Sequence, residues 1–483
     1  MFNDTPWNKS VTEVEGMWWP ANVAAKGKGI KKLRLNGKLR FEPGGALTLK
    51  LYDPDHYGLS WGDNMMHGNV DTTLFSTKVT CLGLYNPYQE GKYITFNISY
   101  VLEGFHHPLN RDNCIKELSF SLQHLSQWVT DSGFIFNQKL ENQTFTISYK
   151  GEKGSWLELT KDFKYKISRN AYSPHKETNE GLVEVREKIL FHLRSNKPAA
   201  IDKYLDLVGV IVDFFTLSML DYSTPYNFHV IGDIRDEDHK IDISHANLIR
   251  PYAIYSKFNF GLDSEVFLFS EKDIIDDKSS ICDYLKIWIN NYSELKVPFS
   301  LYKSALYEEN FAETKFILLS QAIETFHRKV RGGHYIDECD YKSEVFKPLL
   351  VAVSKIQNDS LKESLKSALK YGNEISLWKR ITELIEENRS ILVNYFKLPK
   401  RSKDLGRDIA DIRNFLTHYS SDKVIKHDYM DFYSYLLKCI LELSILRQIG
   451  FSSSKLEAMT ERSFALNYLK LKAPNDLYLY EEG

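Results

Sequence analysis

Three polar residues late in the chain, Arg413, Asn414 and His418, have the types and the spacing to act on a phosphate. Imidazole gives and takes protons near neutral pH without a special environment. A guanidinium keeps its charge and offers forked donors that match phosphate oxygens. Without a carboxylate cage for a metal, these groups suit a metal-independent attack of an RNA 2′-hydroxyl on its adjacent phosphate, in which arginine stabilises charge and histidine moves a proton.

The segment that carries these residues, DIRNFLTHYS (411–420), otherwise has the pattern of a helix. Asn414 and His418 are four residues apart and share one helical face, whereas Arg413 lies about 100° from Asn414 and about 140° from His418. One helix therefore does not bring arginine and histidine head to head, but a second copy across a two-fold axis would close a cleft. The alternative is a solvated arginine and a capped or core histidine near a helix end.

The region beyond Pro298 has few glycines or prolines and is typical of long amphipathic helices. In ETKFILLSQAIETFHRKV (313–330) apolar residues recur at spacings of three and four, and a Gly-Gly pair ends the helix. Further helices are expected at roughly 345–370, 373–396, 403–420 and 428–449. The pattern predicts an all-α helical bundle over residues 301–483.

The front of the chain has a different pattern. Residues 1–150 alternate apolar and polar residues between turn residues, in IKKLRLNGKLRF, ALTLKLYD, STKVTCLGLY, YITFNISYVL and QTFTISYK, with a helical signal only around ELSFSLQHLSQWV. This predicts a β-rich domain. Residues 151–300 mix strands with a buried helix, DKYLDLVGVIVDFFTLSML, which predicts a second domain of mixed α+β type. The chain is thus expected to be a multidomain α+β protein.

Composition limits the possible classes of protein. The 62 basic and 64 acidic residues give a net charge of -2, so affinity for nucleic acid has to come from local patches. The five cysteines are scattered without a CxxC pair, which argues against disulfides or structural zinc and favours a reducing cytoplasm. The N-terminus lacks the pattern of a secretory signal, and the apolar stretch 207–220 is too short to span a membrane. A cytoplasmic protein without membrane role, cofactor or metal is expected.

Supporting residues are expected on either side of the motif. A basic run just upstream includes four candidates for contact with RNA phosphates, Lys400, Arg401, Lys403 and Arg407. The alternative for this run is a solvated loop. On the earlier helix, Glu324 and His327 are candidates to face the motif, one of them by pairing with Arg413. The alternative is a structural ion pair for Glu324 and an exposed His327. The acidic segment DIRDEDHKIDISH (233–245) lacks metal-site spacing and is expected to be a solvated hairpin tip.

The motif Arg413-Asn414-Phe415-Leu416-Thr417-His418, followed by Tyr419, resembles the RN-xxx-H signature of the HEPN superfamily of ribonucleases. The upstream helix with SQAIETFHR resembles the first long helix of the Apea-like branch. GMWWP, followed by short strands and ELSFSLQHLSQWV, resembles the N-terminal domain of ApeA-type anti-phage defence proteins. The resemblance covers the whole chain and is weakest over residues 150–300.

This resemblance implies a homodimer or higher homo-oligomer whose HEPN domains pair their motif helices into a metal-independent endoribonuclease site. Arg413 would stabilise the transition state, His418 would be the general acid or base, and Asn414 would orient one of them. It also implies abortive antiviral defence, in which a phage-derived activator at the N-terminal domains switches on cleavage of RNA, with tRNA as one candidate.

Two other functions stay open. One is a non-catalytic RNA-binding or antitoxin-like dimerisation scaffold. The other is a sugar-binding or hydrolytic protein based on the β-rich domain, where no carboxylate pair can be assigned to acid and base roles.

Overall fold

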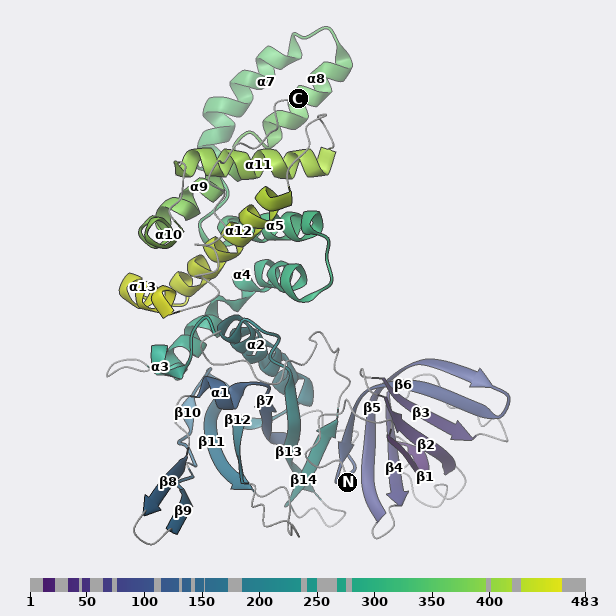
Figure 1. Cartoon of the computed structure of the whole chain (residues 1–483). Coiled ribbons are helices and arrows are strands. Elements are labelled where there is room, and N and C mark those ends of the chain that lie inside the picture. The colour runs from purple at the N-terminus through teal and green to yellow at the C-terminus, as the bar shows by residue number, and fades with distance from the viewer. Residues whose placement is uncertain are drawn as a thin grey trace. The chain divides into compact units, whose positions relative to one another are not determined.

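The computed structural model of the chain describes residues 12–21, 34–42, 46–52, 64–71, 76–107, 114–129, 133–139, 144–151, 153–172, 185–235, 241–249, 267–274, 280–396, 401–418 and 427–462. The chain forms two compact units, Met1–Lys286 and Ile287–Gly483 (Figure 1). The expected division at 1–150, 151–300 and 301–483 places one boundary inside the first unit, whose main sheet continues across residue 150.

Six antiparallel strands of the first unit form a closed ring in the order β6-β3-β2-β1-β4-β5, because β5 also pairs with β6. The strands are β1 (Thr12–Pro20), β2 (Leu35–Phe41), β3 (Leu47–Tyr52), β4 (Met65–Asp71), β5 (Ser76–Glu90) and β6 (Tyr93–Glu103). Alternate residues of β2 and β3 are buried, as a strand with one face on a core requires. Trp18 is fully buried in this core against Gly68, where a Cβ would lie 2.3 Å from the indole.

The same sheet continues beyond β6 through β14, β13, β7, β12, β11 and β10. These strands are β7 (Ile115–Leu122), β10 (Leu157–Glu158), β11 (Phe163–Tyr172), β12 (Arg186–Ala199), β13 (Pro225–Arg235) and β14 (Ile241–Ile249), and β8 (Phe134–Lys139) with β9 (Thr144–Tyr149) forms a separate hairpin. The helices of this unit are α1 (Leu125–Trp128), α2 (Ile201–Met219), α3 (Glu271–Ile274) and the first turns of α4 (Ile281–Tyr307). Helix α2 packs against β7 and β12.

Two expectations for the first unit can be compared with these elements. The helix predicted around ELSFSLQHLSQWV is wrong for the first half of that segment, which belongs to strand β7. Polar and apolar residues alternate there with the period of a strand. The acidic segment 233–245 was expected to be a hairpin tip, and its two ends are paired strand, since β13 pairs with β14 as far as Arg235 and Ile241. Residues 236–240 themselves lie outside the described residues.

The second unit is helical in the part that the structure describes, apart from an isolated β-bridge between His334 and Glu374. After α4 it contains α5 (Ala312–Val330), α6 (Glu338–Asp340), the π-helix η5 (Tyr341–Phe346), α7 (Lys347–Ser354), α8 (Asp359–Lys370), α9 (Leu377–Glu387), α10 (Arg389–Phe396), α11 (Ser402–His418), α12 (His427–Gln448) and α13 (Ser453–Arg462). No helix within the described ranges is long and apolar enough to cross a membrane.

The expected helices at 403–420 and 428–449 correspond closely to α11 and α12. The expected helix at 345–370 is interrupted, because the Asn358 side chain accepts a hydrogen bond from the backbone of Leu361 and starts α8. The helix at 373–396 is likewise divided at Asn388 into α9 and α10. Helix α4 runs through Pro298, since the buried residues around it, among them Leu295 and Phe299, hold the helix together where one backbone bond is lost.

Candidate functional site

Helix α11, which carries the motif, presents one apolar stripe to its neighbours and leaves the other side open. The stripe consists of the buried residues Leu405, Ile409, Ile412 and Leu416, which recur at steps of four, three and four. It packs mainly against α9 and to a lesser extent against α5 (Figure 1). Burial of each such side chain contributes about 1.5–3 kcal/mol, so α11 is firmly seated on this side.

A glycine lets α11 approach α9 closely. A Cβ on Gly406 would lie 2.4 Å from the Thr382 Oγ1 and 2.6 Å from the Trp378 carbonyl oxygen. Two polar contacts tie α11 to other helices: Arg389 Nη1 of α10 donates to Ser402 Oγ at 2.7 Å, and the hydroxyl of Tyr433 in α12 donates to Asp408 Oδ2 at 3.0 Å. The position of the motif helix is thus fixed from several sides.

Arg413 and Asn414 contact each other on the open edge of α11. Arg413 is half-buried and donates from Nη1 to Asn414 Oδ1 at 3.3 Å, while Asn414 is exposed. The Arg413 Nε is buried and has no hydrogen-bond acceptor among the described residues. Thr417 Oγ1 donates back to the carbonyls of Arg413 and Asn414, at 2.8 and 3.2 Å. His418 is the last residue of α11, and its side chain lies outside the described part of the structure.

Of the basic candidates, Arg401, Lys403 and Arg407 are exposed, and Lys400 lies outside the described residues. Lys403 and Arg407 belong to helix α11, so the alternative of a solvated loop is wrong for them. The Lys403 Nζ and the Arg407 Cζ lie 5.9 and 5.4 Å from the centre of the Trp378 ring of α9. Steps of four, seven and four residues place positions 403, 407, 414 and 418 on one side of α11.

Glu324 and His327, which were expected to face the motif, contact other residues. The Glu324 carboxylate accepts a hydrogen bond from Arg328 Nη2 at 3.3 Å, so it forms the structural ion pair that was the alternative. His327 is only 1% exposed and contacts Glu383 and Arg380 of α9, so the alternative of an exposed imidazole is wrong. The expected pairing with Arg413 is not seen among the described contacts of either residue.

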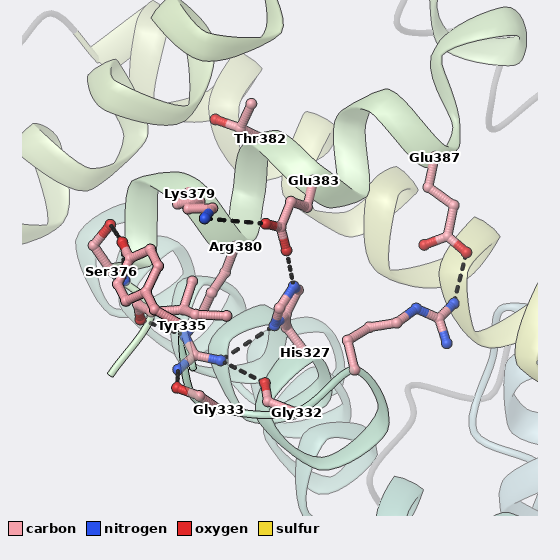
Figure 2. A network of polar contacts seen from close by, with 12 residues as sticks. His327, Gly332, Gly333, Tyr335, Ser376, Lys379, Arg380, Thr382, Glu383 and Glu387 are labelled. Atoms are coloured by element: carbon pink, nitrogen blue, oxygen red, sulfur yellow. Dashed lines mark hydrogen bonds and ion pairs between the residues drawn. The ribbon is translucent and has the colours of Figure 1, made fainter. Parts of the chain in front are cut away.

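His327, Arg380 and Glu383 form a polar network that joins α5 to α9 (Figure 2). The His327 Nε2 lies 2.7 Å from Glu383 Oε2, and its Nδ1 lies 3.1 Å from Arg380 Nη1. Because a guanidinium only donates, Nδ1 has to be the acceptor and the ring proton sits on Nε2. Burial and the nearby charge of Arg380 lower the pKa of His327, against the opposing effect of Glu383. The imidazole is therefore held neutral in one tautomer.

Arg380 is fully buried and connects the end of α5 to the start of α9. Its Nε donates to the Ile375 carbonyl at 2.8 Å, and Nη1 and Nη2 donate to the carbonyls of Gly332 and Gly333 at 3.2 Å each (Figure 2). Burial lowers the pKa of Arg380. Sequence reasoning missed this residue, although its position in the buried stripe of α9, next to Ile381, was a detectable signal.

Two family models match the chain. The first, described as Apea-like HEPN, matches residues 317–455, which hold α11 and the network of Figure 2. The second, described as ApeA N-terminal domain 1, matches residues 13–288, more than half of the chain. The chain belongs to the ApeA family. No curated protein and no solved structure gives a match.

The ApeA assignment agrees with the resemblance found in the sequence and with the fold, a strand-rich first unit followed by a helical HEPN unit. It supports a defence protein of the HEPN type, and HEPN domains are generally ribonucleases that dimerise. The ApeA N-terminal match also spans residue 150 without a break. Within the described residues, no three His, Cys, Asp or Glu side chains gather as metal ligands would.

Proposed function

We propose that this ApeA-family protein is a metal-independent endoribonuclease of anti-phage defence, which cuts RNA at a site shared by two copies of its HEPN domain. The observation that carries the proposal is the state of Arg413. Its guanidinium is held by Asn414 at the open edge of α11, and its buried Nε has no acceptor among the described residues. A guanidinium held in this way keeps its charge and offers forked donors that match phosphate oxygens.

The chemistry follows from the two ionisable side chains. The 2′-oxygen of the RNA attacks the adjacent phosphorus while the bond to the 5′-oxygen of the next nucleotide breaks. His418 accepts the proton of the 2′-hydroxyl, and a protonated imidazole returns one to the leaving oxygen. Arg413 stabilises the charge that develops on the phosphate, and Asn414 fixes the direction of Arg413. The products carry a 2′,3′-cyclic phosphate and a 5′-hydroxyl.

Two copies of α11 are needed because of helix geometry. Positions 413 and 418 lie about 140° apart around one helix, so a single helix does not present both to the same ligand. A two-fold pairing of motif helices brings the arginine of one copy toward the histidine of the other. The packing that seats α11, through Gly406 and the apolar stripe, keeps each half-site rigid, as a composite site requires.

The strand-rich N-terminal unit is proposed to be the sensor. A phage-derived activator would bind there and raise the ribonuclease above its basal activity, so that it degrades RNA of the infected cell in the cytoplasm, with tRNA as a candidate substrate. The competing function, a non-catalytic RNA-binding or antitoxin-like scaffold, uses the same dimer but needs no proton transfer by His418. The two functions therefore differ in what loss of that imidazole does.

Expression in bacteria tests this difference. We expect growth arrest from the unaltered protein and normal growth with His418→Ala or Arg413→Ala. His334→Ala is the matched control, since His334 is an exposed histidine of the same unit outside the motif, and it should arrest growth like the unaltered protein. Equal arrest by His418→Ala would show that catalysis is not the cause and would favour the scaffold.

A further inference from the structure

We infer that Trp378 is the surface on which an unpaired base of the substrate stacks, so that the enzyme selects single-stranded over double-stranded RNA. The inference rests on the proposed ribonuclease function and specifies the substrate of that site. It starts from the contacts of one half-buried indole at the beginning of α9.

Trp378 lies beside the open face of α11. Lys403 and Arg407 are one helical turn apart and both place their cationic groups over its ring, at 5.9 and 5.4 Å from the ring centre. Gly406 stands between them, and a Cβ there would come within 2.6 Å of the Trp378 carbonyl oxygen. The indole is therefore held directly against the helix that carries Arg413 and Asn414.

The distance to the motif suits a short stretch of one strand. Asn414 is seven residues beyond Arg407, about 10 Å along the helix axis, and His418 is about 6 Å further. All three positions lie on the same side of α11. A base on Trp378 and the scissile phosphate at the motif can therefore belong to nucleotides a few positions apart in one strand.

Binding of RNA would exchange the partners of these groups. Lys403 and Arg407 are exposed, and a solvated cation over an aromatic ring is held only weakly. Phosphates bind such cations and release counterions. The ring face that the cations leave would accept a base, a stronger contact than the one lost. In a duplex the base faces are already stacked on each other, so a duplex gains only the phosphate contacts.

The chain itself contains a matched control. Trp156 in the first unit also lies under two cations, Lys166 at 4.8 Å and Arg194 at 4.1 Å. It has the same local chemistry, but it belongs to the first unit, whereas the motif helix belongs to the second. Its replacement should leave RNA binding unchanged if the position of Trp378 beside α11 is what matters.

The test measures binding of a fluorescein-labelled 20-nucleotide single-stranded RNA, and of the same RNA in a duplex, by chains that carry His418→Ala so that no RNA is cut. Trp378→Leu should weaken binding of the single strand about tenfold, by the loss of one stacked base, and change duplex binding less than twofold. Trp378→Tyr should restore binding, and Trp156→Leu should have no effect. Melting temperatures show whether each variant is folded.

The inference would be overturned if the chain with Trp378→Leu bound the single strand as tightly as the chain with Trp378 intact. It would also be overturned if Trp378→Leu weakened binding of the duplex as much as binding of the single strand, or if the chain with Trp378 intact bound no RNA. Cleavage by chains with an intact His418 is measured in parallel. RNA cut as fast with Trp378→Leu as with Trp378 would refute the inference and leave the ribonuclease standing. Selective loss of binding without any cleavage by the unaltered chain would refute the ribonuclease and leave Trp378 as the base-stacking residue of an RNA-binding scaffold.

Discussion

The substitution Gly406→Ala tests how strongly the site depends on the close packing of α11 on α9. The new methyl group would lie 2.4 Å from Thr382 Oγ1 and 2.6 Å from the carbonyl oxygen of Trp378. Thr382 cannot easily turn away, because its hydroxyl donates to that same carbonyl at 2.7 Å. The two helices therefore have to move apart.

The magnitude follows from two opposing contributions to the free energy of unfolding. Alanine is favoured over glycine in a helix interior by about 1 kcal/mol. The clash costs about 1–3 kcal/mol, as other overpacked contacts do. We expect a net destabilisation of about 0–2 kcal/mol and a fall in RNA cleavage of roughly 10- to 100-fold, because displacement of a catalytic group by about 1 Å has effects of that size.

The assay compares urea unfolding and RNA cleavage with those of Gly209→Ala. Gly209 lies in α2, and a Cβ there would have nothing within 4 Å, so this control should gain about 1 kcal/mol of stability and keep full cleavage. If Gly406→Ala is stabilised as much as Gly209→Ala and cuts RNA at the original rate, the close packing does not position the site and this reasoning is wrong.

Three further predictions concern other contacts. Arg380→Met leaves three backbone carbonyls and the buried Nδ1 of His327 without their donor and should destabilise the second unit by about 3 kcal/mol in urea unfolding, and a loss below about 1 kcal/mol would contradict this. Asn414→Ala frees Arg413 and should lower kcat for RNA cleavage roughly tenfold with little change in KM, whereas a pure rise in KM would assign Asn414 to binding. Burial and the neighbouring His106 hold the pKa of His67 at about 4, below the usual value near 6.5. As the pH falls, His67 of the unfolded chain binds a proton before His67 of the folded chain does. About 3 kcal/mol of folding stability that is present above about pH 6.5 is therefore lost as the pH falls to 4. His67→Phe should reduce this pH dependence of urea unfolding. An unchanged pH dependence would show that His67 is not its cause.

The sequence was sufficient for elements whose periodicity is regular over their whole length. Strands β2 and β3 alternate strictly, and α11 repeats its apolar residues at helical spacing, so both types were predicted correctly. The extent of the first unit was not predictable in this way. Strand β7 lies between β12 and β13, which follow it by many residues, and such pairings depend on tertiary contacts that a local pattern does not contain.

The candidate site was predictable where its residues are adjacent in sequence. Arg413 contacts Asn414 because neighbours on one helix edge are within reach of each other. The network joins His327 to Arg380 and Glu383, which lie more than fifty residues further along the chain, and no spacing rule connects them. A charged residue in the apolar stripe of α9 indicates that a buried partner exists, but only the packing of α5 on α9 shows which one it is.

The chemistry of the cleaved ends tests the central claim most directly. The purified chain is incubated with RNA in excess chelator, beside Arg413→Ala and His418→Ala. Our account predicts fragments that end in 2′,3′-cyclic phosphate from the unaltered chain, and a loss of at least about a hundredfold in the rate with either variant. Undiminished cleavage by His418→Ala, or fragments that end in a 3′-hydroxyl, would contradict it.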